Sequence, residues 1–220
     1  MTGNNISLEE TKMMVLLVFL LIPVVFANPA PPACTPPQVS NIPVQSGFDF
    51  DKFSDNGSKW YLVLYNKMIS VPGMNVPLNE SNVFFRFFRN SSNELTGKMV
   101  GRVRLNKSIP PFCTSQKSKI TQSTEEPAKL HQTFNNPFST KPLTFHYWIL
   151  QTDYSNMAVV FACQKELGDG TCSPGDTYLW TLSRTPNHTP AEMGKIDKLA
   201  TSVCLKKFRK VNHQSPCTGK

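Results

Sequence analysis

The feature of this sequence that most constrains its fold is a series of eight short apolar runs separated by turn residues. The runs cover residues 59–68, 82–90, 95–105, 117–124, 127–134, 145–153, 157–164 and 177–184. Because side chains alternate between the two faces of a strand, runs of this length and pattern are typical of strands. Eight of them at near-regular spacing predict an all-β fold, an antiparallel up-and-down barrel rather than an α/β sheet.

Two of these runs indicate which side chains point into the barrel. In 82–90, Phe85 and Phe87 share one face, and Asn90, which begins an N-x-S/T sequon, lies on the other face. A glycan must lie outside a barrel, so Phe85 and Phe87 are expected to point inward. The run 95–105 divides in the same way, because its apolar residues share one face and its charged residues the other.

One helix is predicted after the last strand. Thr189 precedes Pro190 and Glu192, an order typical of a helix N-terminus, with a capping side chain, proline at the first position and acid in the first turn. The apolar residues that follow are spaced three and four apart. This apolar stripe needs a partner, so the C-terminal helix is expected to pack outside the barrel.

The N-terminal segment predicts export. Met13 to Ala27 is an apolar run broken only by Pro23, and it ends in Val25-Phe26-Ala27, which suits signal-peptide cleavage after Ala27. A run of this kind is shorter than the roughly 20 residues that span a bilayer, so no membrane span is expected. We therefore predict a signal peptide at 1–27, a Pro-rich arm at 28–47 and a secreted, extracellular protein.

Cysteines and sequons support the same compartment. Six cysteines, an even number, in an exported chain indicate disulfide bonds, and none has the spacing of a metal site. The five N-x-S/T sequons after residue 27 predict glycosylation at Asn56, Asn79, Asn90, Asn106 and Asn187.

The positive charge of the chain does not by itself identify a partner. The formal net charge is +8, but the Lys and Arg residues are spread along the chain without interleaved aromatic residues. We therefore expect no nucleic-acid partner. His131 and His146 could in principle ligate haem. A lone histidine on a strand is more often a surface or core residue, so no cofactor and no metal are predicted.

Three short motifs add a resemblance. They are Trp60-Tyr61, Thr152-Asp153-Tyr154 within the stretch 147–156, and Arg184 at the end of the last run. In this order and spacing they resemble the signature regions of the lipocalins, and the stretch 147–163 is similar to the branch with apolipoprotein D, insect bilin-binding proteins and crustacyanins. The resemblance covers roughly 34–217, so 48–217 is expected to be one lipocalin domain.

The resemblance implies roles for the motif residues. In lipocalins a tryptophan of the first strand is packed by an arginine from the end of the last strand, which closes one end of the barrel. Trp60 and Arg184 are expected to form this pair. Asp153 lies in the turn between the sixth and seventh strands. No Ser/His/Asp or paired-carboxylate arrangement is apparent around Asp153, so we expect a turn carboxylate that accepts hydrogen bonds from backbone amides rather than a catalytic residue.

The resemblance also implies disulfide pairs. Cys34 and Cys163 match the pair that ties the N-terminal arm to the seventh strand in this branch. The second bridge of the branch has no counterpart, because no cysteine lies between Cys34 and Cys113. Three pairings remain for the other four cysteines; the favoured one joins Cys113 with Cys217 and Cys172 with Cys204.

The resemblance and the alternation together predict a ligand pocket. Trp148 has the position of the tryptophan in the Tyr-Trp-Ile-Leu strand of the family, and Leu150 follows on the same face. With Phe85 and Phe87, these residues are expected to contact the ligand.

The predicted function is extracellular binding and transport of a small hydrophobic ligand, such as a retinoid, bilin, carotenoid, sterol or fatty acid. One alternative is a secreted protein-interaction lipocalin with a filled barrel. The other is an enzyme on this fold, an isomerase with a free pocket thiol or a de-epoxidase; the even cysteine count argues against a free thiol, and no enzyme is predicted. Assembly into homo- or hetero-oligomers is compatible with the resemblance.

Overall fold

The computed structural model describes residues 34–68, 79–104, 108, 110–135, 142–205, 207–215 and 217, with Asn79 and Glu80 described in their backbone only. The predicted signal peptide 1–27, residues 28–33 of the arm and the sequon residue Asn106 lie outside the described residues. The described residues from Thr35 onward form one compact unit.

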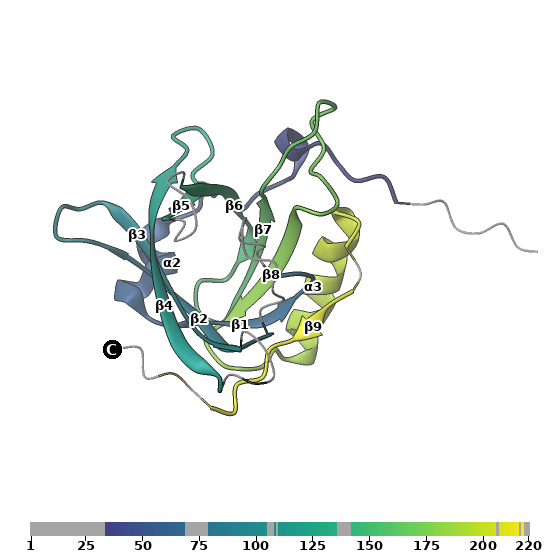
Figure 1. The fold of residues 1–220 in the computed structure, drawn as a ribbon. Helices are drawn as coiled ribbons and strands as arrows, with labels where there is room; N and C mark the ends of the chain where they lie inside the picture. The colour runs from purple at the N-terminus through teal and green to yellow at the C-terminus, as the bar shows by residue number, and fades with distance from the viewer. Residues whose placement is uncertain are drawn as a thin grey trace, which may run out of the picture. The chain divides into compact units, whose positions relative to one another are not determined.

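Eight antiparallel strands close into a barrel, as predicted (Figure 1). The strands are β1 (Trp60–Tyr65), β2 (Asn79–Arg89), β3 (Leu95–Arg104), β4 (Phe112–Gln122), β5 (Lys129–Phe134), β6 (Leu143–Thr152), β7 (Met157–Cys163) and β8 (Thr177–Ser183). Strands β2 to β8 pair in sequence order, and β1 closes the barrel because it pairs with both β8 and β2.

Strand β1 changes partner along its length. Its first residues, Trp60 and Tyr61, pair with β2, and its last residues, Leu64 and Tyr65, pair with the short strand β9 (Arg209–Lys210). The C-terminal segment thus completes the sheet where β2 has moved away from β1.

Two helical elements precede β1 at one end of the barrel. Helix α2 (Phe50–Ser54) is capped at its N-terminus by Asp49, whose side chain accepts hydrogen bonds from the backbone amides of Asp51 and Lys52. The 3-10 helix η3 (Asp55–Gly57) follows, and a further one, η2 (Val39–Asn41), lies in the segment before them. Phe50 and Phe53 of α2 are buried, so this helix covers the end of the barrel with aromatic side chains.

Helix α3 (Pro190–Ser202) lies outside the barrel, as predicted. Thr189 accepts a hydrogen bond from the backbone amide of Glu192, and the Glu192 carboxylate accepts one from the amide of Thr189. This capping box fixes where the helix begins. Ile196 and Ala200 are the buried residues of the helix and pack on the outer surface of the barrel.

The apolar residues separate into two large clusters. The inner cluster consists of Phe48, Phe50, Phe53, Trp60, Leu62, Val83, Phe85, Phe87, Ile120, Ala128, Leu130, Tyr147, Ile149, Ala158, Val160, Ala162, Tyr178, Trp180, Leu182 and Val211. The outer cluster consists of Val39, Ile42, Trp148, Leu150, Met157, Val159, Phe161, Cys163, Cys172, Leu179, Ile196, Ala200 and Val203. Alternate residues of β6, β7 and β8 belong to different clusters, so these strands are buried on both faces.

None of the helices in the described ranges has the length and apolarity of a membrane-spanning helix.

Candidate functional site in the barrel interior

Strand β6 places Tyr147 and Ile149 inside the barrel, and Trp148 and Leu150 outside. The first two belong to the inner cluster and the other two to the outer cluster. The prediction that Trp148 and Leu150 line the ligand pocket is therefore wrong. All four residues are buried, so apolar character could not distinguish the faces of this strand.

Trp148 instead supports the packing of the segment 38–44 against the barrel. Its ring packs in the outer cluster with Val39 and Ile42, and the Lys129 ammonium lies 4.5 Å from the ring centroid. Lys129 Nζ also donates a hydrogen bond to the carbonyl of Ser40 at 3.4 Å. The tryptophan is thus held between a strand and the covering segment.

Phe85 and Phe87 point inward, as the alternation predicted, and begin an aromatic cluster inside the barrel. Ring centroids of Phe85 and Trp180 are 6.0 Å apart, those of Tyr147 and Trp180 are 5.9 Å apart, and those of Phe87 and Tyr147 are 5.7 Å apart. These separations are typical of aromatic pairs. Because the rings come from β2, β6 and β8, they meet across the barrel and fill this part of it.

The pocket prediction missed Tyr147 and Trp180, which contribute to the same cluster. Tyr147 is 1% exposed and Trp180 is 1% exposed. Trp180 Nε1 donates a hydrogen bond to the Lys67 carbonyl at 3.0 Å, so its polar atom has a partner. The alternation that oriented Phe85 could not orient these two residues. Their strands have no charged residue on the outer face beside them, because β6 has Trp148 and Leu150 there and β8 has uncharged residues.

The hydroxyl of Tyr147 is the unusual group of this interior. It is buried and has no hydrogen-bond partner among the described residues. Burial raises the pKa of Tyr147, so the group stays a neutral hydroxyl that can donate and accept. An unpaired buried hydroxyl costs about 1–3 kcal/mol. Within the inner cluster, the Tyr147 hydroxyl is therefore able to form a hydrogen bond with a bound molecule.

A pair of buried hydrogen bonds connects strands β3, β4 and β5. Gln132 Nε2 donates to Ser118 Oγ at 2.8 Å, and Ser118 Oγ donates to the Gly97 carbonyl at 3.2 Å. A Cβ atom on Gly97 would lie 2.6 Å from Ser118 Oγ and 2.7 Å from Gln132 Nε2. Glycine at position 97 thus leaves room for these two polar side chains, which would have to move if the residue had a Cβ atom.

Arg184 packs on Trp60 at the end of the barrel covered by α2, the closed end, as the resemblance implied. The guanidinium carbon lies 3.7 Å from the centre of the indole ring. Arg184 donates to the carbonyls of Phe53 at 3.0 Å and Lys59 at 3.3 Å, and Trp60 Nε1 donates to the Phe53 carbonyl at 2.8 Å. Burial lowers the pKa of Arg184, and the charge of Asp55 opposes this shift.

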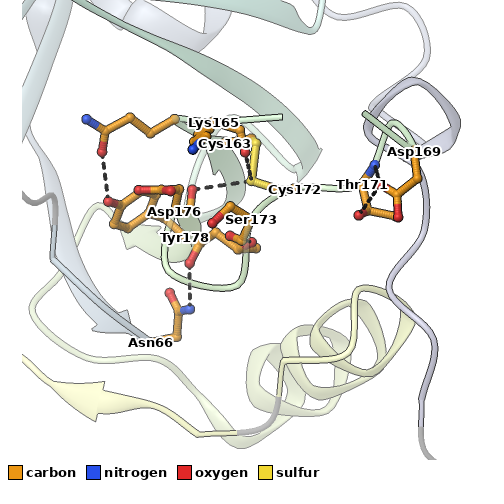
Figure 2. The surroundings of a disulfide bond; sticks show 11 residues. Asn66, Cys163, Lys165, Asp169, Thr171, Cys172, Ser173, Asp176 and Tyr178 are labelled. Atoms are coloured by element: carbon orange, nitrogen blue, oxygen red, sulfur yellow. Dashed lines mark hydrogen bonds between the residues drawn. A yellow bond between two sulfur atoms is a disulfide. The ribbon is translucent and has the colours of Figure 1, made fainter. Parts of the chain in front are cut away.

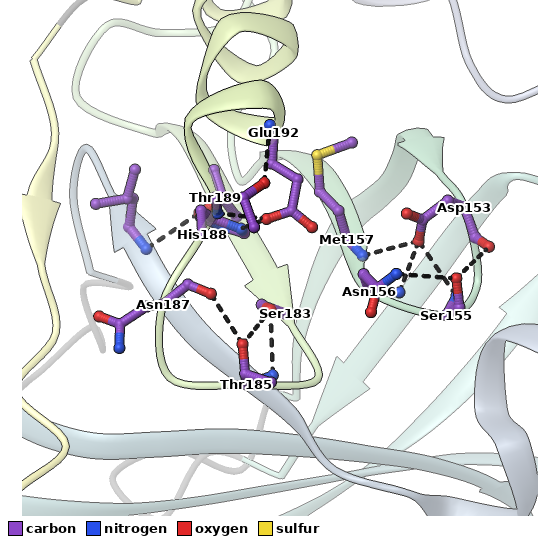
Figure 3. A network of polar contacts seen from close by, with 12 residues as sticks. Asp153, Ser155, Asn156, Met157, Ser183, Thr185, Asn187, His188, Thr189 and Glu192 are labelled. Atoms are coloured by element: carbon purple, nitrogen blue, oxygen red, sulfur yellow. Dashed lines mark hydrogen bonds and ion pairs between the residues drawn. The ribbon is translucent and has the colours of Figure 1, made fainter.

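Asp153 accepts backbone hydrogen bonds, which is the role expected for it. Its Oδ1 accepts from the amides of Ser155 at 3.2 Å, Asn156 at 2.7 Å and Met157 at 2.8 Å (Figure 3). Tyr154 adopts a left-handed backbone conformation with φ 64°, and its hydroxyl accepts from the amide of Asp49 at 3.1 Å. The turn therefore links β6 and β7 to the segment that leads into α2.

The disulfides correct two of the three predicted pairs. Cys163 is bonded to Cys172, so the predicted pairs Cys34–Cys163 and Cys172–Cys204 are both wrong (Figure 2). The predicted bond between Cys113 and Cys217 is present. Cys34 and Cys204 are disulfide-bonded as well.

The Cys163–Cys172 bond has a local cause. Cys163 ends β7, and the loop before β8 folds back through a bridge between Glu166 and Cys172. This brings the two Cα atoms to 5.9 Å, within the range of disulfides. The loop thus supplies a partner for Cys163 that the family resemblance did not include.

Three of the five predicted glycosylation residues have described side chains. Asn56 and Asn187 are exposed, and Asn90 is half-buried in the turn between β2 and β3. There its Oδ1 accepts from the amides of Ser92 at 3.0 Å and Glu94 at 2.9 Å. Their glycosylation stays a prediction.

His131 and His146 lie side by side on the outer surface, where they are paired between β5 and β6. Their ring centroids are 5.3 Å apart, and burial lowers the pKa of His146, with a further contribution from His131. Neither ring can reach a molecule inside the barrel. Within the described ranges, no group of three or more His, Cys, Asp or Glu side chains has the arrangement of a metal site.

Comparison with known proteins agrees with this architecture. The model of the lipocalin / cytosolic fatty-acid binding protein family matches residues 83–213. Retinol-binding protein 4-A of Oncorhynchus mykiss is 28% identical over 183 residues, which cover 82% of this chain and 97% of that protein. Retinol-binding protein 4 of Gallus gallus is 28% identical over 185 residues, covering 82% and 87% of the two chains.

Solved structures share the fold at lower identity. Insecticyanin of the tobacco hornworm Manduca sexta superposes with a TM-score of 0.55 at 14% identity, covering 83% of this chain and 87% of that chain. Lobster apocrustacyanin A1 gives a TM-score of 0.52 at 15% identity, covering 81% and 94%. With the family match over more than half of its length, the chain belongs to the lipocalin / cytosolic fatty-acid binding protein family.

Proposed function

We propose that this protein is an extracellular carrier that binds a small hydrophobic molecule with one polar group inside its barrel. Membership of the family and the similarity to retinol-binding proteins support binding and transport of a hydrophobic ligand. The signal-peptide pattern at 1–27 and the disulfide bonding of all six cysteines support secretion, because such bonds persist in oxidising compartments.

The observation that carries this proposal is the unpaired Tyr147 hydroxyl within the inner cluster. Its surroundings are aromatic rings of Phe85, Phe87 and Trp180, which favour an apolar ligand body. A hydroxyl, carbonyl or carboxyl group of the ligand would satisfy the tyrosine. Burying about 300 Å² of ligand surface at about 25 cal/mol per Å² contributes roughly 7–8 kcal/mol before the costs of association.

The test compares ligands with and without the polar group. We would titrate the secreted protein with retinol and with a retinoid of the same skeleton that lacks the hydroxyl, and repeat this with Tyr147→Phe. Loss of one hydrogen bond at about 1–1.5 kcal/mol predicts roughly 5- to 10-fold weaker retinol binding by the variant. Binding of the retinoid without a hydroxyl should change little.

Tyr61→Phe is the matched control, because Tyr61 lies outside the barrel beside Phe84 and His213. It should bind both retinoids like the parent protein. Saturable binding that is equal in the parent and in Tyr147→Phe would refute the role of the hydroxyl. Absence of saturable binding for retinol, fatty acids and sterols would refute the carrier function itself.

A protein-interaction function is the second candidate, and the contacts of rings across the barrel favour it. Phe85, Tyr147 and Trp180 fill part of the space that a ligand would otherwise occupy. Native mass spectrometry after mild purification separates the two functions, because only a carrier should retain a small molecule. Thiol-dependent isomerase chemistry has less support, since all six cysteines are disulfide-bonded.

A further inference from the structure

A column of uncharged polar side chains lines the inside of the barrel on β4 and β5. We call Thr114, Gln116, Ser118 and Gln132 the polar column. Three of its members precede Ile120 of β4 at intervals of two residues, and the fourth follows Leu130 of β5 by two. Ile120 and Leu130 belong to the inner cluster, and neither strand shows a register shift in its pairing. Alternate residues of a strand share a face, so all four side chains point into the barrel.

The aromatic cluster does not fill the interior beside this column. Phe85 and Phe87 are at most 2% exposed. Thr114 and Gln116 also point inward, but they are half-buried, as is Met99 on the neighbouring strand β3. Solvent therefore reaches the interior on the side of β3 and β4. Strand β8, which carries Trp180 of the aromatic cluster, lies across the barrel from β4 (Figure 1).

Gln132 has hydrogen-bonding capacity that the protein itself does not use. The residue is 1% exposed, and among the described residues its amide makes one hydrogen bond, from Nε2 to Ser118 Oγ at 2.8 Å. Its Oε1 atom and its second N–H have no protein partner there. Burying an amide group without partners costs free energy. A ligand that pairs with Gln132 would recover this cost on binding.

The length of the column favours a ligand with several polar groups. The distance from Thr114 to Ser118 along β4 is about 13 Å, because each residue of a strand adds roughly 3.4 Å. A single terminal polar group could pair with only one part of this length. All four side chains are uncharged, so a charged group beside them would lack the opposite charge that its burial requires.

We propose that the barrel selects a neutral, rigid polycyclic ligand with hydroxyl groups along one edge, as in polyhydroxylated steroids. The hydroxyls would pair with the polar column, and the apolar face would pack on the rings of Phe85, Tyr147 and Trp180. A rigid ring system holds its hydroxyls on one edge without the ordering cost of a flexible chain. This inference rests on the proposed carrier function and extends the ligand class beyond the one polar group expected at Tyr147.

The test compares two steroids that have the same skeleton and the same ketone groups. Progesterone has no hydroxyl group, whereas cortisol adds several. The full secreted protein should bind cortisol at least about 10-fold more tightly than progesterone, because progesterone would leave buried polar groups unpaired. Equilibrium dialysis with radiolabelled steroids measures both affinities.

The column variant carries Thr114→Val and Gln132→Leu. The matched control carries Thr121→Val and Gln214→Leu, the same chemical changes at exposed residues away from the column. Two lost hydrogen bonds predict about 10- to 30-fold weaker cortisol binding by the column variant, with progesterone bound as well as before or better. The control should bind both steroids like the parent protein.

Gln116→Met tests the same column at a half-buried position, where folding does not depend on a buried amide. Its lost hydrogen bond should weaken cortisol binding by about threefold to 10-fold and leave progesterone binding unchanged. This variant keeps the test valid if the column variant does not fold.

Several results would overturn the inference and leave the carrier function standing. They are equal affinity of the parent for the two steroids, an equal preference in the parent and the column variant, and binding of retinol without binding of either steroid. Tighter binding of monoolein, a flexible lipid with hydroxyl groups at one end, would assign the column to a lipid head group instead. Absence of saturable binding for retinol as well as for the steroids would refute the carrier function itself.

Discussion

The inner and outer clusters lie on opposite faces of strand β6 and differ in which elements bury them. Each contains a tryptophan, Trp180 inside and Trp148 outside, and each has a buried polar atom without a partner among the described residues, Tyr147 Oη inside and Trp148 Nε1 outside. The inner cluster is enclosed mainly by strands. The outer cluster is completed by the segment 38–44 and helix α3, so its burial depends on packing outside the barrel. Burial of aromatic residues alone therefore does not identify the ligand site.

Removing the outer tryptophan should have the largest effect. Trp148→Ala should destabilise the protein by about 3–5 kcal/mol, because it leaves a large cavity beneath Val39 and Ile42 and removes the contact of Lys129 with the ring. Urea unfolding measures this change. Retinol affinity of the folded fraction should stay unchanged. Lost affinity at parental stability would instead place Trp148 in the ligand site.

The fold could be predicted from the sequence because its strands are marked by turns and by outward charged residues. The prediction was least accurate at β4, which was expected at 117–124 and begins at Phe112. Thr114 and Gln116 are polar residues in the inward phase of this strand, so its first half has no apolar alternation. The strand is recognised there only through its pairing with β3.

The inward-facing residues of the site were harder to predict where a strand lacks alternation between apolar and polar residues. Alternation placed Phe85 and Phe87 correctly, since Arg86 and Asn90 mark the outer face of β2. Strand β6 has no charged residue on its outer face at Trp148 and Leu150, because other parts of the chain cover this face. The part of β6 around Trp148 and Leu150 is buried on both faces and has no polar side, so the prediction relied on the position of Trp148 in the family motif and gave the wrong side.

The closed end should respond more moderately than the outer cluster. Arg184→Ala should destabilise by about 1–3 kcal/mol, because it removes the guanidinium from the Trp60 ring and leaves the carbonyls of Phe53 and Lys59 with fewer donors. Thermal and urea unfolding measure the change. Ligand affinity should remain nearly parental in the folded protein. A selective loss of affinity would show that Arg184 contacts the ligand.

Tryptophan emission distinguishes the two clusters with little change in stability. Trp180→Phe and Trp148→Phe keep an aromatic ring, and each should cost less than about 1.5 kcal/mol. An apolar ligand should quench or shift the emission of the parent protein. This response should disappear largely in Trp180→Phe and persist in Trp148→Phe, since only Trp180 belongs to the inner cluster. The opposite result would assign the ligand to the outer surface.

The smallest expected effect is a pH dependence confined to the outside of the barrel. Among the described residues, the polar residues that are buried include no Asp, Glu, Lys, Arg or His. Outside, His188 lies between β8 and α3, with Nε2 2.7 Å from Thr181 Oγ1 and Nδ1 3.6 Å from the Glu192 carboxylate (Figure 3). Its side chain is 1% exposed, and burial lowers its pKa against the opposing charge of Glu192.

The sign of this dependence follows from linkage. The unfolded chain takes up a proton at His188 as the pH falls through about 6.5, whereas the folded protein resists protonation until lower pH. Stability should therefore be full above about pH 6.5 and decrease as the pH falls towards 5. Urea unfolding across this range should show a shallower decrease for His188→Gln than for the parent protein. Affinity for retinol, which does not titrate here, should stay constant in the folded fraction; an affinity that falls with pH while stability does not would show that a titrating group reaches the ligand.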